Sequence, residues 1–142
     1  MYYDGDADPT ELAGRTVAVG NAVLDVVLSE GFLDSVRRSS LRLRQHLARL
    51  RDAHPSLIEE IRGEGLMIGL KCTIPNLDVV QAAMQERLLT IAAGDNVVRL
   101  LPPLTIEEAD IATSVERIDR AATQVEAAAA RERSGTQQGA AE

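Results

Sequence analysis

Few residues of this sequence could carry out chemistry. Lys71 is the only lysine and Cys72 the only cysteine among the 142 residues. The two histidines are His46 and His54. A lysine can form a Schiff base with a carbonyl cofactor, a cysteine can act as a nucleophile, and histidines can bind a metal ion.

The surroundings of these four residues favour ordinary structural roles. Lys71 adjoins Cys72 at the end of an alternating strand, where we expect an outward-facing surface lysine, with a Schiff-base role as the alternative. Free cysteine is commonly a small buried hydrophobe, which we expect of Cys72. His46 and His54 have no acidic partner spaced for metal binding, so we expect them at the surface. The sequence thus predicts no catalytic residue and no metal site among them.

Arg99 is the fifth candidate, because it is the one charged residue between Asn96 and Leu104. A guanidinium binds a carboxylate through two parallel hydrogen bonds, each contributing roughly 1.5–3 kcal/mol. A buried arginine without a partner is costly. Arg99 therefore either points into water from an edge strand or holds an anionic group, and the residues alone favour neither interpretation.

Hydrophobic periodicity and turn residues predict the elements that position these side chains. Helices are predicted over 16–28, 33–53, 77–87 and 105–131, and strands over 66–70, 88–92 and 97–101. The last two strands form a hairpin around Gly94-Asp95-Asn96, and Thr105 with Glu108 forms a capping box. This order predicts an α+β fold, a small, mostly antiparallel sheet covered by helices.

The buried faces of the two long helices follow from spacing. The predicted stripes are Leu33, Val36, Ser40, Leu43, Leu47 and Leu50 in one helix, and Ile111, Val115, Ile118, Ala122 and Val125 in the other. Six arginines lie mainly off the first stripe, at 37, 38, 42, 44, 49 and 51. We interpret them as a solvated outer face, with a phosphate-binding face as the alternative.

The glycines at 63, 65 and 69 resemble a dinucleotide-binding fingerprint only superficially. Gly63 and Gly65 precede the predicted strand, whereas the fingerprint needs its glycines after a strand and at the start of a helix. We therefore expect Gly63 and Gly65 to form a turn or bulge.

Composition limits the classes of function. The formal net charge of −7 argues against nucleic-acid binding. No stretch has the roughly 18 apolar residues of a membrane span, and the acidic N-terminus lacks the features of a signal peptide. One cysteine permits no internal disulfide, so a reducing, cytoplasmic location is expected. We expect a poorly ordered lead-in over 1–15, one domain with its leading helix over 16–131, and a solvated tail over 132–142.

Three stretches carry a resemblance to a known family. They read AVGNAVLDVVLSEGFLDSV, IRGEGLMIGLKC and AAGDNVVRLLPPLTIEEADI. In order and spacing they resemble the C-terminal part of class III aminotransferases, which are fold-type I enzymes that use pyridoxal phosphate. Within that family the acetylornithine branch is most similar, and the ornithine, succinylornithine and aminobutyrate branches are near relatives. The resemblance covers roughly residues 17–122.

This resemblance implies a role for Arg99. It occupies the place of the family arginine that holds the α-carboxylate of the amino-acid substrate. The family reaction moves an amino group between an amino acid and a 2-oxo acid, typically from N-acetylornithine to 2-oxoglutarate in arginine biosynthesis. The implied fold is the small domain with its leading helix, and the implied assembly is a homodimer whose active sites draw on both subunits.

The departures from the family are equally informative. Three features of the family lie upstream of the matching region: the Schiff-base lysine, the aspartate that pairs with the pyridine nitrogen, and the glycine-rich phosphate loop. Lys71 does not match the motif of the family lysine. We therefore expect a C-terminal fragment that is inactive alone and binds no pyridoxal phosphate by itself. Two alternatives are a stand-alone module that binds a small carboxylate through Arg99, and an interaction module that self-associates through residues 16–28.

Overall fold

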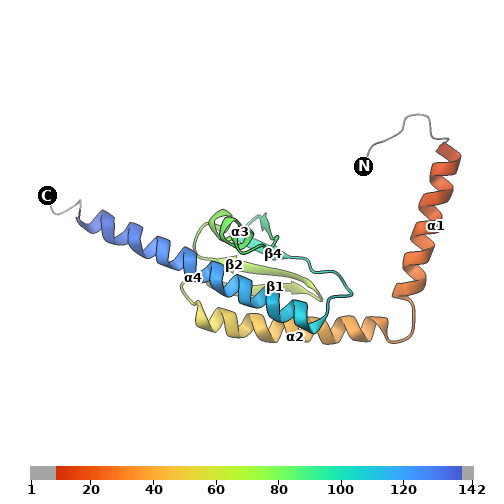
Figure 1. Ribbon diagram of the computed structural model, residues 1–142, viewed down its shortest axis with the longest axis horizontal. Helices are drawn as coiled ribbons and strands as arrows, with labels where there is room; N and C mark the ends of the chain where they lie inside the picture. The colour runs from red at the N-terminus through yellow and green to blue at the C-terminus, as the bar shows by residue number, and fades with distance from the viewer. Residues whose placement is uncertain (1–8, 139–142) are drawn as a thin grey trace. The chain divides into compact units, whose positions relative to one another are not determined.

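The computed structural model describes residues 9–138 of the chain (Figure 1). The chain divides into two compact units, residues 1–35 and 36–142, which we describe separately. The helices are α1 (Pro9–Val27), α2 (Phe32–Ala53), α3 (Asn76–Gln85) and α4 (Glu108–Gln138). The strands are β1 (Ile58–Glu64), β2 (Met67–Cys72), β3 (Ile91–Ala93) and β4 (Val97–Leu100).

The second unit contains a four-stranded sheet in the order β1-β2-β4-β3, with every neighbouring pair antiparallel. The β1–β2 hairpin turns at Gly65 and Leu66, and Gly63 near the end of β1 and Gly65 in the turn have φ angles of 113° and 55°. The β3–β4 hairpin turns through Asp95 and Asn96, at φ 57° and 54°. Both turns use left-handed backbone, which Gly, Asn and Asp adopt most readily. The prediction that residues 88–101 contain a hairpin is confirmed. The predicted turn near Gly63 and Gly65 is present, but it lies at Gly65 and Leu66, and Gly63 belongs to β1.

One face of this sheet is covered by helices. Ile68 and Leu70 of β2 and Val98 and Leu100 of β4 are buried, and they alternate with more exposed residues as the pleat requires. Helices α2 and α4 run along the sheet (Figure 1), and α3 packs on α4. The buried helix residues belong to the same hydrophobic core, namely Leu43, Leu47, Leu50, Val79, Ala82, Ala83, Ile111, Ile118, Ala121, Ala122 and Val125. The predicted α+β class is confirmed, as is most of both helix stripes.

Strand β1 is the element that the sequence interpretation missed. Its sequence, IEEIRGE, carries four charged residues, and only Ile58 is fully buried. As an edge strand it needs no regular apolar alternation, and charges at an edge discourage pairing with other chains. The apolar alternation that predicted a strand in this hairpin belongs to β2, with which β1 pairs.

Helix boundaries also differ from the predictions. Helix α4 begins at Glu108, and the first helical bond runs from the Ile111 amide to the Glu107 carbonyl over 3.1 Å. Thr105 lies in the preceding turn, so the predicted capping box is wrong. The helix continues to Gln138, beyond the predicted end near residue 131. The rest of the expected tail, residues 139–142, lies outside the described residues.

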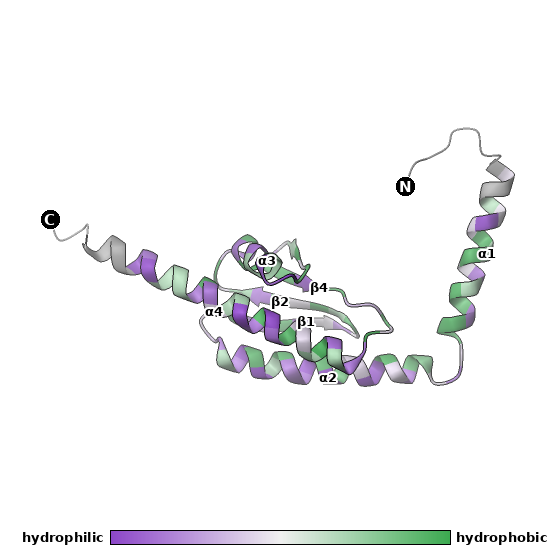
Figure 2. Cartoon of the chain, in the orientation of Figure 1, coloured by the Kyte–Doolittle hydropathy of each residue, from purple (hydrophilic) through white to green (hydrophobic). Residues whose placement is uncertain are grey.

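The first unit contains α1, which begins at Pro9 rather than at the predicted residue 16. Residues 9–15, expected in an unstructured lead-in, are therefore helical, and residues 1–8 lie outside the described part of the chain. Figure 2 shows hydrophobic residues along the length of α1. The large exposed ones are Val17, Val19, Val23, Leu24 and Val26.

Across residues 9–138, no single helix is both long and apolar enough to cross a membrane. Residues 13–27 and 32–53 reach the required length and composition only when they are counted together.

Candidate functional site

Arg99 lies on the face of the sheet that the helices leave uncovered. We call this the open face, and its side chains are those of Glu60, Arg62, Glu64, Met67, Lys71, Ile91, Ala93, Val97 and Arg99. Arg99 is exposed and stands opposite Gly69 on β2 and Ile91 on β3. Within residues 9–138, no group forms a hydrogen bond or ion pair with its guanidinium. The charge of Arg99 is therefore directed to solvent and available to an anion.

Gly69 has no side chain, so nothing projects from β2 at the position opposite Arg99. A Cβ atom at this position would lie 2.7 Å from Cγ1 of Val97, a contact that real Cβ atoms do not make. Because Gly69 and Ile91 stand opposite Arg99, no charged residue lies directly opposite it on either neighbouring strand. A ligand carboxylate could therefore approach the guanidinium along the sheet surface.

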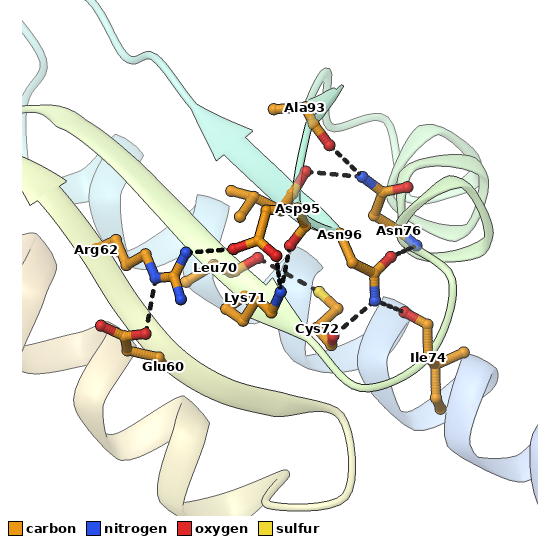
Figure 3. A network of polar contacts seen from close by, with 11 residues as sticks. Glu60, Arg62, Leu70, Lys71, Cys72, Ile74, Asn76, Ala93, Asp95 and Asn96 are labelled. Carbon is orange, nitrogen blue, oxygen red and sulfur yellow. Dashed lines mark hydrogen bonds and ion pairs between the residues drawn. The ribbon is translucent and has the colours of Figure 1, made fainter.

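Two asparagines hold the β3–β4 turn in place (Figure 3). The Asn96 amide donates to the carbonyls of Cys72 (2.6 Å) and Ile74 (2.9 Å), and its Oδ1 accepts from the Asn76 backbone amide (2.8 Å). Asn76 in turn donates to the carbonyls of Ala93 and Val97, both at 2.9 Å. These bonds tie the turn to the β2–α3 connection and so fix the strand that carries Arg99.

The sequence interpretation assigned no role to Asn76 and treated Asn96 only as a turn residue. A possible sequence signal is that asparagine is common at left-handed turn positions. Its use as a bridge between two loops depends on the fold.

Lys71 is less exposed than expected. Its side chain is 17% exposed, and its ammonium donates to the Asp95 carboxylate and to the Asp95 backbone carbonyl, the latter over 2.6 Å (Figure 3). Arg62 donates to the same carboxylate (2.6 Å) and to Glu60 (2.7 Å). Lys71, followed by Arg62, lowers the pKa of Asp95. The expectation of a solvent-facing lysine is corrected, because an aspartate 24 residues away in sequence pairs with it.

Cys72 is buried, as expected, with 2% of its surface exposed. Burial raises the pKa of its thiol to about 11, although the backbone of Val98 and the charge of Lys71 act in the opposite direction. The thiolate is the reactive form of cysteine, so this thiol is inert at neutral pH. Cys72 is a core residue rather than a nucleophile.

His54 is buried, and the expectation that it lies at the surface is wrong. Only 7% of the residue is exposed. Its Nδ1 lies 2.8 Å from Oε2 of Glu126, and its Nε2 lies 3.0 Å from Oδ1 of Asp119. Burial by itself lowers the pKa of His54, but the hydrogen bonds with Glu126 and Asp119 outweigh burial and raise it. His46 is half-buried.

Within the described residues, no group of three or more His, Cys, Asp or Glu side chains could hold a metal ion. The contacts of His54 with Asp119 and Glu126 therefore form an ion-pair cluster, which joins the end of α2 to α4.

Four of the six arginines of α2, at 37, 38, 42 and 49, are exposed, which supports the interpretation of a solvated outer face. Arg42 pairs with Glu108, Arg44 donates to the Gly63 carbonyl, and Arg51 pairs with Asp52 at 2.8 Å.

Among the described residues, two surface cavities lie away from the open face. One, of about 850 Å³, lies between α3 and the distal half of α4. The other, of about 450 Å³, is mainly apolar and lies beside the β4–α4 connection. Neither Arg99 nor Lys71 lines them.

The fold and the arginine on its open face define a class of protein. Residues 14–122 match the model of the family described as aminotransferase class III, and the chain belongs to that family. Residues 14–27 of α1 lie within the match, as do all four strands.

Among curated proteins, the chain is similar to the acetylornithine aminotransferase of Mesorhizobium japonicum, with 54% identity over 102 residues that make up 72% of this chain and 26% of the relative. The corresponding enzyme of Brucella melitensis is 53% identical over 109 residues, covering 72% and 27%. This chain thus spans about a quarter of the length of these relatives.

Solved structures agree with this assignment. The N-acetylornithine aminotransferase of Stenotrophomonas maltophilia superposes with a TM-score of 0.71 at 30% identity, covering 78% of this chain and 31% of that one. The ornithine aminotransferase of Toxoplasma gondii, described with pyridoxal phosphate in partial occupancy at its active site, gives a TM-score of 0.65 at 28% identity, covering 72% and 25%.

Pyridoxal phosphate is the cofactor of this family, and the described residues do not fit it. The cofactor needs a free lysine amine, whereas the ammonium of Lys71 is engaged by Asp95. The two cavities contain no lysine, and the larger is lined by glutamate and aspartate as well as by Arg133. We therefore derive no chemical step through the cofactor from these residues.

Proposed function

We propose that this chain forms the substrate-carboxylate part of an acetylornithine-type aminotransferase, with Arg99 as the residue that binds the α-carboxylate. The observation that carries this proposal is the exposed, unpaired guanidinium of Arg99 within the family-matched region. The names of the similar acetylornithine aminotransferases support N-acetylornithine as the amino donor. The family resemblance of the sequence implies 2-oxoglutarate as the acceptor. The whole reaction needs groups that the described residues do not provide.

The binding role predicts a loss of affinity in Arg99→Ala. We expect wild-type chain to bind N-acetylornithine weakly in an NMR titration, and Arg99→Ala to bind at least roughly tenfold more weakly, because one charge-assisted contact contributes about 1.5–3 kcal/mol. Arg133→Ala is a matched control, since Arg133 is an exposed arginine near the end of α4. Equal binding by wild type and Arg99→Ala would contradict the role of Arg99.

We further propose that this chain does not transfer amino groups by itself. Its only lysine has its amine in an ion pair with Asp95. Purified chain titrated with pyridoxal phosphate at neutral pH should show no imine absorbance and no turnover of N-acetylornithine with 2-oxoglutarate. An imine band that disappears in Lys71→Gln would overturn this proposal.

A second candidate role is self-association through α1. The exposed valines and leucines of this helix support it, because contiguous apolar surfaces commonly mark interaction sites. Sedimentation of the purified chain tests it, since a monomer at every concentration would count against an interface on α1.

A further inference from the structure

The open face holds three cations and the two carboxylates that pair with them. Arg62, Lys71 and Arg99 lie on adjacent strands of this face, with Glu60 on β1 and Asp95 in the β3–β4 turn. Figure 3 shows Asp95 reaching over the sheet toward Lys71 and Arg62. Which of the three cations can bind a ligand depends on which of them already pair with these two carboxylates.

The three cations are close enough to act on one small ligand. Lys71 stands opposite Val97, so it is a diagonal neighbour of Arg99, with a separation of roughly 7–8 Å. Arg62 stands opposite Gly69, which stands opposite Arg99, so about 9.5 Å separates the two arginine backbones. Gly69 places no side chain between the two arginines.

Asp95 occupies two of the three cations. One carboxylate oxygen accepts from Lys71 and the other from Arg62, the latter over 2.6 Å. The Asp95 backbone carbonyl gives Lys71 a second acceptor, and Glu60 takes the Nε–H of Arg62 at 2.7 Å. Because Lys71 and Arg62 lower the pKa of Asp95, this carboxylate stays ionised at neutral pH. Among the described cations of the open face, Arg99 alone has no protein partner.

We propose that Asp95 limits this face to one ligand carboxylate, bound at Arg99, because it neutralises Lys71 and Arg62. The inference rests on the proposed role of Arg99. A second carboxylate on the ligand would have to compete with Asp95 for Lys71 and Arg62, and it would be repelled by the charges of Asp95 and Glu60. The second carboxylate of a dicarboxylate such as 2-oxoglutarate is therefore not held at this face.

Asp95→Asn tests this assignment with little risk to the fold. Residue 95 has φ 57°, and asparagine adopts left-handed backbone at least as readily as aspartate, so the turn is preserved. The amide keeps the size of the side chain but removes the charge that holds Lys71 and Arg62. Thermal unfolding of the variant checks that the fold is intact.

The ligands are butyrate, with one carboxylate, and glutarate, with two, titrated at pH 7 and fixed ionic strength. Wild type should bind the two with affinities that agree within about twofold. In Asp95→Asn, glutarate should bind roughly three- to tenfold more tightly and butyrate should change little, because two cations become available to the second carboxylate. Glu86→Gln is a matched control, since it removes a carboxylate that pairs with Arg120 at 2.6 Å between α3 and α4.

The possible failures are distinguishable. If wild type binds neither ligand in an Arg99-dependent way, the proposed function fails, and this inference falls with it. If Arg99-dependent binding is present but Asp95→Asn gains no preference for glutarate, only the role of Asp95 is refuted. A gain that persists in the double variant with Arg99→Ala, or that Glu86→Gln reproduces, would also refute it.

Discussion

Gly63→Ala is expected to destabilise the protein by about 2–4 kcal/mol or to prevent folding. Gly63 has φ 113°, a conformation that residues with a Cβ atom rarely adopt. A Cβ atom there would lie 2.0 Å from the Met67 carbonyl oxygen and 3.1 Å from Cα of Ile68. Both are backbone atoms of the β1–β2 hairpin, so the clash cannot be relieved by turning a side chain. Chemical denaturation followed by circular dichroism measures the effect.

Gly65→Ala is the matched control for this prediction. Gly65 lies in the β1–β2 turn, two residues after Gly63, at φ 55°, and a Cβ atom there would have open space within 4 Å. The expected cost is about 1–2 kcal/mol, that of placing a non-glycine residue in left-handed backbone. A Gly63→Ala variant as stable as Gly65→Ala would show that the hairpin can shift to accommodate a methyl group.

His54→Leu is expected to lower the free energy of unfolding by about 2 kcal/mol at pH 6, and by less at higher pH. Both ring nitrogens of His54 face carboxylates, at 2.8 Å and 3.0 Å. Only the imidazolium can donate from both nitrogens, so the protonated ring suits this position best. Asp119 and Glu126 lie seven residues apart on α4, which places them two turns apart on one helix face.

The direction of the pH dependence follows from the pKa shifts. The pKa of His54 is raised by folding, so its contribution to stability is complete below the unfolded value of about 6.5 and is lost as pH rises through the folded pKa. Burial by itself raises the pKa of Glu126, but hydrogen bonds from Ser56 and His54 outweigh burial and lower it. The contribution of Glu126 is therefore present above the unfolded value of about 4.3 and is lost as pH falls through the folded pKa.

The stability difference between wild type and His54→Leu should thus be largest between roughly pH 4.5 and 6.5 and should shrink toward pH 9. His46→Leu serves as the control, because it removes the other histidine. Thermal unfolding of the three proteins at several pH values provides the comparison. A difference that is constant from pH 5 to pH 9 would mean that His54 stabilises the protein by packing alone.

The presence of strand β1 and the burial of His54 were not predicted from the sequence. A charged edge strand has no apolar alternation, so IEEIRGE gave no signal. His54 looked like a surface residue because its partners, Asp119 and Glu126, are 65 and 72 positions away. By contrast, the stripe of α2 was recognisable because its spacing is a local property of the chain, and Leu43, Leu47 and Leu50 are buried.

The candidate site divides in the same way. Its position as the one charged residue between Asn96 and Leu104, together with the flanking motifs, pointed to Arg99 from sequence. Its orientation was left open, and the structure shows that its side chain is exposed. The ion pair of Lys71 could not be predicted from sequence, because its partner Asp95 lies 24 residues away, in the turn of a different hairpin.

The sequence by itself determined the helices, the β3–β4 hairpin, the α+β class and the membership of the aminotransferase family. These depend on periodicity, turn residues and motifs that lie within short stretches of chain. Tertiary structure alone decided which charges are neutralised: His54 by α4, and Lys71 and Arg62 by Asp95. The physical reason is that the energy of a charge depends on the groups folded around it, and the sequence does not state which groups those are.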